Sequence, residues 1–219
     1  MSISLAGLRG LIRERLPSTA TWSDSNLTQW ILDAIADYSK VFPQTELTAT
    51  IDCAAGVREY DLSAALVSPH VITSVEYPAG EDPPVYLIRC SHRDLRGFVG
   101  GAYYDVLGAP PATLVIGEEP LATEDIVVTY SGDHAYPSAD GDLLTVPDQD
   151  MEALTLFAIW KAAELLRAVE GANPRFETLL LTQFDSMVYR AEVAYRAWLR
   201  AARKQVAESA FVSWEGLGL

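Results

Sequence analysis

The chain is poor in the residue types that mark reactive sites. Its 219 residues include three histidines and two cysteines. No run of about 18 apolar residues occurs, so the sequence predicts no membrane span. The first fifteen residues mix charged with apolar side chains and have no small-residue cleavage site, so we expect no signal peptide. Buried free thiols are the default for Cys53 and Cys90, which lie far apart.

Positive charge is scarce as well. The formal net charge is −14, and residues 50–150 alone hold four basic and seventeen acidic side chains, a net of −13. Such a segment repels the phosphates of nucleic acids, which disfavours a classical DNA-binding domain. Solubility alone is the simpler explanation of this charge.

Motifs for catalysis are missing too. His70, His92 and His134 are isolated from one another. Residues 91–94 place Ser, His and Asp in one short stretch. Residues that are adjacent in sequence seldom have the geometry of a catalytic triad. A helix that begins with Ser91 as its N-cap explains the same residues. The glycines of residues 97–101 match no phosphate-binding pattern. We therefore predict no enzyme, no catalytic residue and no cofactor-binding residue.

Neither possible set of metal ligands matches a known motif. The cysteines lack the closely spaced pair that is typical of zinc sites. The carboxylates of residues 132–142 do not follow EF-hand spacing, which leaves a weak surface cation site as the alternative. We predict no bound metal. The residues concerned are Cys53, Cys90, His70, His92, Asp133, Asp140 and Asp142.

Helical periodicity opens the chain. Apolar residues recur at helical spacing over 5–16, and Pro17 ends that run. A second helix follows, with Ser23 as its N-cap, Asp24 in its first turn and Pro43 as its stop. Trp22 and Leu27 have the spacing of a hydrophobic staple.

The middle of the chain has the residue pattern of β-strands. Short β-branched and aromatic runs, separated by Pro, Gly and Asp, predict strands at 47–51, 71–77, 85–90, 113–116 and 126–130. Their alternation favours an antiparallel sheet with one exposed face. Residues 91–108 leave a short helix and a strand at 103–104 as open alternatives.

Two more helices are predicted after Pro147. Asp148 or Thr145 would cap the first, and Gly171 would end it. Asn173 and Pro174 would start the second. If it ran from 174 to 205 it would span roughly 45–50 Å, which exceeds a small core, so part of its apolar face should meet a neighbour.

The sequence thus predicts an α+β fold, in which two N-terminal and two C-terminal helices form a four-helix bundle with an inserted antiparallel β-rich domain. The segments are 1–45, the N-terminal half of the bundle; 46–146, the acidic insertion; 147–207, the C-terminal half; and 208–219, an extended docking tail.

The last twelve residues are apolar and aromatic, and Gly216 and Gly218 argue against a continued helix. This tail either folds back onto its own chain or docks on another subunit, and we favour docking. Five basic residues precede it: Arg190, Arg196, Arg200, Arg203 and Lys204. They are most simply explained by the helix C-terminus and an acidic neighbour, with nucleic acid as the alternative. The candidate partner-binding residues are Trp198, Arg200, Arg203, Phe211, Val212, Trp214, Leu217 and Leu219.

Two stretches carry a family resemblance. Residues 22–43, WSDSNLTQWILDAIADYSKVFP, and residues 146–166, VPDQDMEALTLFAIWKAAELL, resemble the helices of tailed-bacteriophage head–tail adaptor proteins, also called connector or neck proteins. The resemblance covers both helical blocks, about half of the chain. It consists of caps and apolar spacing and includes no catalytic signature.

The resemblance implies a structural virion protein, made in the host cytoplasm and located in the neck between capsid and tail. Such adaptors form a homo-oligomeric ring, typically dodecameric, beneath the portal protein. They extend the DNA channel, through which DNA passes without specific binding, and they offer a platform to tail or stopper proteins. A C-terminal segment often reaches toward the portal, a role that residues 211–219 would suit. We also expect no membrane partner, because the sequence predicts no membrane span.

Two alternatives belong to other classes. One is a soluble α+β enzyme with an unrecognised site, which would turn over a substrate. The other is a tail-terminator or tail-tube structural protein, which would be mostly β and would lack the helical bundle. A helix content far below about one-third would favour the tube-type protein.

Overall fold

The computed structural model describes residues 3–16, 22–91, 101–121, 124–171 and 178–215, with side chains at 170–171, 178–181, 183–184 and 205–215 left outside the description. The chain divides into two compact units. The helical unit combines Met1–Phe42 with His134–Leu219, and the β unit is the single continuous stretch Pro43–Asp133.

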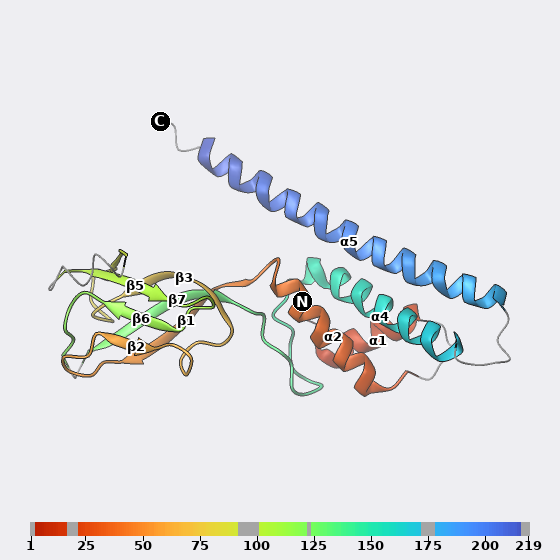
Figure 1. Ribbon diagram of the computed structural model, residues 1–219, viewed down its shortest axis with the longest axis horizontal. Coiled ribbons are helices and arrows are strands. Elements are labelled where there is room, and N and C mark those ends of the chain that lie inside the picture. Colours follow the sequence, from red (N-terminus) through yellow and green to blue (C-terminus); the bar gives the residue numbers. More distant parts are fainter. Residues whose placement is uncertain (1–2, 17–21, 92–100, 122–123, 172–177, 216–219) are drawn as a thin grey trace. The chain divides into compact units, whose positions relative to one another are not determined.

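The helical unit contains four α-helices among the described residues (Figure 1). None of the described helices is both long and apolar enough to cross a lipid bilayer. The helices are α1 (Leu5–Arg15), α2 (Asp24–Ser39), α4 (Met151–Gly171), which follows the 3₁₀ turn η1 (Asp148–Asp150), and α5 (Thr178–Glu215).

Serine caps begin the first two helices. The Ser4 hydroxyl accepts a hydrogen bond from the Gly7 amide, and the Ser23 hydroxyl accepts one from the Asn26 amide, each at 3.2 Å. The predicted cap of the second helix is thereby confirmed, as is Asp24 in its first turn. This helix ends at Ser39 and does not extend to Pro43.

The start of α4 differs from the prediction. The 3₁₀ turn that precedes it begins at Pro147 without a side-chain capping hydrogen bond, so neither Asp148 nor Thr145 is the N-cap of this turn. The Thr145 hydroxyl instead lies 3.1 Å from His134 Nδ1 and accepts a hydrogen bond from the Ala135 amide. The predicted end of this helix at Gly171 is confirmed.

The last helix runs further than predicted. α5 continues to Glu215, so the extended conformation predicted for residues 208–215 is wrong. The glycines that argued against a helix stand at 216 and 218, beyond its end, and residues 208–215 contain neither Gly nor Pro. Leu217 and Leu219 lie outside the described residues.

One hydrophobic cluster joins the segments on either side of the β unit. Its members are buried side chains from all four helices and from the segment before α4. Leu144 and Val146 are each 3% exposed in this cluster, which is why the helical unit resumes at His134 and not at the predicted boundary near 147. Members from the helices include Leu8, Ile12, Leu27, Ile31, Ile35, Leu154, Phe157 and Tyr195.

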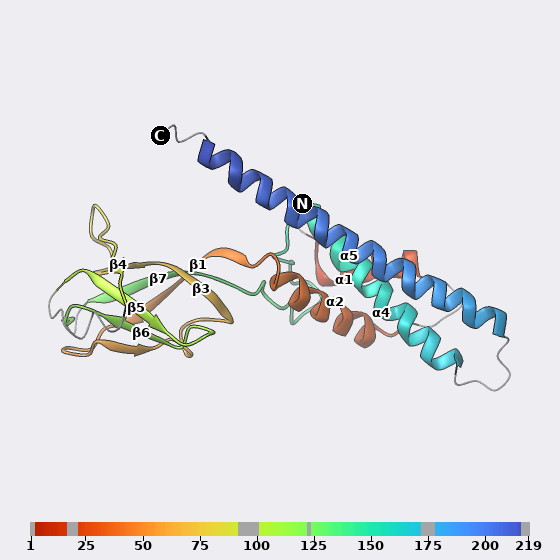
Figure 2. The same ribbon diagram turned by 45° about the horizontal axis from the view of Figure 1, so that its top comes forward.

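The β unit contains two sheets where one was predicted (Figure 2). One has the order β1-β7-β3 and the other β2-β6-β5-β4, and all pairings are antiparallel except that of β4 with β5. The strands are β1 (Gln44–Asp52), β2 (Glu59–Asp61), β3 (Pro69–Glu76), β4 (Ile88–Arg89), β5 (Tyr103–Leu107), β6 (Thr113–Ile116) and β7 (Asp125–Gly132).

The five predicted strands all occur, although the one expected at 85–90 is reduced to β4. The strand alternative at 103–104 is confirmed by β5, and β2 was missed because its three residues are too short for a periodic pattern. Buried side chains from both sheets form a second cluster, which includes Ile72, Val75, Tyr104, Leu114, Ile116, Ile126 and Val128.

Within each unit, the chain leaves and returns at neighbouring points. In the helical unit, the His134 amide donates to the Ser39 hydroxyl at 3.0 Å, and His134 Nε2 lies 3.2 Å from the Phe42 carbonyl. In the β unit, Gln44 and Gly132 are partners in the β1–β7 ladder. In each unit, the residues at which the chain enters and leaves are therefore bonded or paired with one another.

Candidate partner-binding surface

Tyr195 packs α5 against the other helices of its own chain. Its side chain is 2% exposed, and its ring lies 5.2 Å from that of Phe157 at an interplanar angle of 78°. Its hydroxyl donates a hydrogen bond to Asp37 at 2.6 Å. Burial and this hydrogen bond raise the pKa of Tyr195, so the phenol keeps its proton and acts as a donor.

Trp198 is the second anchor of α5. It is partly buried against the helical cluster, with its ring 6.2 Å from that of Tyr38 and 6.1 Å from that of Phe42. The Tyr38 hydroxyl in turn donates to Asp150 at 2.6 Å. Trp198, a predicted partner-binding residue, thus helps to hold α5 against its own unit and keeps only part of its surface accessible.

The opposite side of α5 is exposed. Tyr189 is 68% and Val193 45% exposed, and the Arg196 and Arg200 side chains also face solvent. The spacing of 189, 193, 196 and 200 places all four on one face, turned away from Tyr195. We call these four residues the outer face of α5. The sequence pattern indicated the arginines, but Tyr189 and Val193 were not predicted, although their helical spacing to the arginines was an available signal.

The basic residues of α5 do not stand at the end of the helix. Arg200, Arg203 and Lys204 lie more than two turns before Glu215, and the last turn contains no basic residue. Because the macrodipole effect falls off within the last turn, it does not explain these residues, and the prediction that placed them at the C-terminus is wrong. Residues 193–207 also contain no carboxylate, so this stretch is purely basic in its charge.

The remaining predicted contact residues lie farther along α5. Arg200 and Arg203 are exposed on the turns that follow Trp198. Phe211, Val212 and Trp214 belong to the helical backbone of α5, and their side chains lie outside the description. The structure thus places six of the eight predicted residues on one continuous helix.

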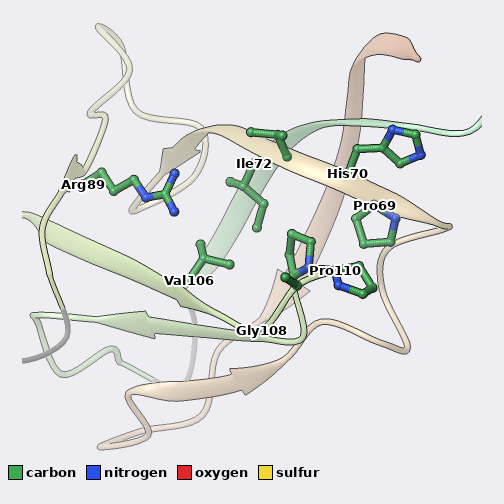
Figure 3. Close-up of a pocket in the computed structure, with 10 residues that line it drawn as sticks. Pro69, His70, Ile72, Arg89, Val106, Gly108 and Pro110 are labelled. Atoms are coloured by element: carbon green, nitrogen blue, oxygen red, sulfur yellow. The ribbon is translucent and has the colours of Figure 1, made fainter. Parts of the chain in front are cut away.

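The β unit contains a pocket of about 440 Å³ (Figure 3). Pro69, His70 and Ile72 of β3 stand on one side, with Arg89 and the turn at Gly108 and Pro110 around it. Gly108 takes a φ of +98°, a conformation that favours glycine. His70 Nε2 lies 2.8 Å from an Asp133 carboxylate oxygen. Among the described residues that line this pocket there is no serine, cysteine or carboxylate, so these residues offer no nucleophile with a base.

The other reactive residues stay apart. Cys53 is buried and Cys90 partly buried, and the two are not linked. Burial raises the pKa of the Cys53 thiol, which disfavours the nucleophilic thiolate. Residues 92–94 of the Ser-His-Arg-Asp stretch lie outside the description. Within the described ranges, no three His, Cys, Asp or Glu side chains are grouped as metal ligands.

Comparison with known proteins identifies the family. The family model for the SU10 adaptor protein matches residues 3–208, which covers both helical blocks and the β unit. No curated protein matches the chain. The match confirms the resemblance to bacteriophage head–tail adaptors and indicates a structural role in the virion. The chain belongs to the SU10 adaptor protein family.

Proposed function

We propose that this chain forms a homo-oligomeric, dodecameric ring in the virion neck. The ring joins the portal protein to tail or stopper proteins and extends the DNA channel. The family match supports the adaptor role, and the dodecamer follows the symmetry that the resemblance implies. We assign the protein no catalytic function.

We further propose that the four helices act as one bundle with the β unit as an insertion. The support is the hydrophobic cluster that unites residues from before and after Pro43–Asp133. The neighbouring positions of Phe42 and His134, and of Gln44 and Gly132, would allow such an insertion with little strain on either unit.

The end of α5 is the segment that we assign to the portal. The observation that carries this assignment is its length: α5 has 38 residues and α4 has 21, which correspond to roughly 57 Å and 32 Å. Among the α5 side chains that the structure describes, which end at Lys204, the last that pack against the helical cluster are Trp198 and Leu199. In both views α5 runs on past its neighbour α4 (Figures 1 and 2). Residues 208–215 therefore continue α5 past these two anchors.

DNA would pass this ring without being held. The β unit holds fourteen acidic and four basic residues, a net of −10, and such a charge repels phosphate. Neutralising several of its exposed carboxylates should raise the retention of the protein on immobilised duplex DNA at low salt. Unchanged retention would contradict the repulsion.

A truncation tests the portal assignment. Removal of residues 208–219 should leave the thermal unfolding of the purified chain unchanged, because this segment lies beyond Trp198, and should weaken capture by the portal protein. The matched control replaces the same twelve residues with a Gly-Ser segment of equal length, which should fail in the same way. A truncated chain that binds the portal as the full chain does would refute the assignment.

A further inference from the structure

The outer face of α5 combines apolar with basic side chains. Tyr189 and Val193, 68% and 45% exposed, lie on the same face as Arg200. Arg196 pairs with Glu192 at 2.6 Å on the same helix, whereas no carboxylate among the described residues pairs with Arg200. Because the macrodipole does not account for these charges, the face has the character of a surface that meets an acidic and partly apolar partner.

The β unit carries a surface with the opposite charge. Tyr86 and Ile88 are 56% and 63% exposed, while Leu87 between them is 7% exposed and packs into the β cluster. Alternation along this extended segment therefore turns Tyr86 and Ile88 to the same exposed side. Glu81 and Asp82 precede them and are exposed. We call Glu81, Asp82, Tyr86 and Ile88 the β4 patch.

Neighbouring residues reinforce the acidic character of this patch. Glu76 forms an isolated antiparallel bridge with Tyr86, so one more acidic residue pairs with the patch, and its carboxylate accepts a hydrogen bond from the Gly80 amide at 2.9 Å. Arg89 is the nearest basic residue in sequence, and its side chain lines the pocket of Figure 3. The exposed apolar side chains of the patch and its exposed carboxylates thus lie a few residues apart on the same hairpin, which backbone hydrogen bonds from Tyr77 to Val85 and from Leu87 to Val75 hold together.

We propose that the outer face of α5 in one copy of this chain packs on the β4 patch of a neighbouring copy. Tyr189 and Val193 would cover Tyr86 and Ile88, and Arg200 would meet Glu81 and Asp82. The two surfaces are different, so the contact is heterologous, and a heterologous contact that closes on itself generates a ring. The inference therefore builds on the proposed ring and names the surfaces that join its subunits.

Disulfide trapping between separate chains tests this contact. One chain carries Val193→Cys and the other Ile88→Cys, both in a Cys90→Ser background that leaves only the buried Cys53. The matched control replaces Ile88→Cys with Val67→Cys, since Val67 is 71% exposed on the same unit. Because a disulfide requires Cα atoms within about 7 Å, we expect about tenfold more mixed dimer from the 193–88 pair than from the 193–67 pair.

A charge-reversal experiment is the second test of this contact. Arg200→Glu in the first chain should lower the yield of the 193–88 dimer about tenfold, because like charges would then face each other. Glu81→Lys and Asp82→Lys in the second chain should restore it. Circular dichroism of each variant checks that it is folded.

The outcomes separate this contact from the ring itself. Equal yields from the two cysteine pairs, or a yield that ignores the charge exchange, would overturn the proposal. Loss of portal or duplex binding in Arg200→Glu with unchanged trapping would also overturn it, and would assign the face to that partner. If rings form on the portal without the 193–88 dimer, the inference fails while the proposed function stands. Trapping without rings would support the contact and contradict the ring.

Discussion

The two units of this protein differ in how the chain builds them. The β unit is one continuous stretch whose first and last strands pair with each other. The helical unit depends on segments that are separated by those residues. Charge divides them as well, because the β unit holds −10 of the net −14.

The difference motivates the partner-binding surfaces that we propose. The helical unit has a long helix with two aromatic anchors on one face and exposed apolar and basic residues on the other. The β unit is acidic around a closed core. The two units have separate cores, and the contact that we propose between copies would join the exposed basic face of α5 to an acidic part of the β unit.

The largest effects on stability are expected from a cavity-forming substitution in one hydrophobic core at a time. Leu154 is 1% exposed in the helical unit and Leu114 is 0% exposed in the β unit. Each Leu→Ala substitution should lower the free energy of unfolding of its own unit by about 3 kcal/mol. All five tryptophans lie outside residues 43–133, so their fluorescence follows the helical unit.

The two substitutions control each other. Leu154→Ala should shift the tryptophan transition in urea, and Leu114→Ala should leave it in place while the tyrosine signals of the β unit change. If both substitutions shift the tryptophan transition equally, the units unfold as one and the division between them is wrong.

A smaller effect is expected at the aromatic anchors of α5. Trp198→Ala removes a partly buried ring from Tyr38 and Phe42, and should lower the stability of the helical unit by about 2 kcal/mol. Tyr189→Ala on the exposed face of the same helix is the matched control and should change stability by less than about 0.5 kcal/mol. Urea unfolding followed by fluorescence measures both. Equal losses would contradict the assignment of inner and outer faces.

The smallest effect concerns acid stability of the β unit. Hydrogen bonds from the Tyr77 hydroxyl and the Leu121 amide hold the pKa of Glu124 below its ordinary value of 4.5. A carboxyl whose pKa is lowered on folding stabilises the fold above its unfolded pKa and loses that contribution as pH falls through the folded pKa. Glu124→Gln should therefore lower the Tm at pH 7, and the difference from wild type should shrink as pH falls below 4.5. A difference that stays constant with pH would contradict this.

Local chemistry made much of this fold predictable. The Ser23 cap, the end of α4 at Gly171 and the strand Thr113–Ile116 follow from residues within a few positions of each other, and all three are confirmed. The division into two sheets was not predictable, because strand pairing joins residues far apart, as in the register of Ile51 with Ile126. Thr145, one of the two caps predicted for α4, has a different role that depends on the tertiary fold: its hydroxyl lies 3.1 Å from His134 Nδ1 and accepts a hydrogen bond from the Ala135 amide.

The candidate surface was only partly predictable. Helical spacing predicted that Arg196, Arg200, Arg203 and Lys204 lie on nearby faces of one helix. Whether the helix macrodipole explains these charges depended on where the helix ends. With α5 continuing to Glu215, the explanation from the helix terminus no longer holds. Exposure of Tyr189 and burial of Tyr195 depend on which side of α5 meets the other helices, a tertiary fact that the spacing of apolar residues left ambiguous.

Electron microscopy of the purified chain mixed with the portal protein of the same phage tests the central claim most directly. The account predicts a closed ring of this chain on the portal, and it predicts bare portals when residues 208–219 are removed. A chain that stays monomeric and leaves the portal bare at micromolar concentration would contradict the adaptor role that we propose.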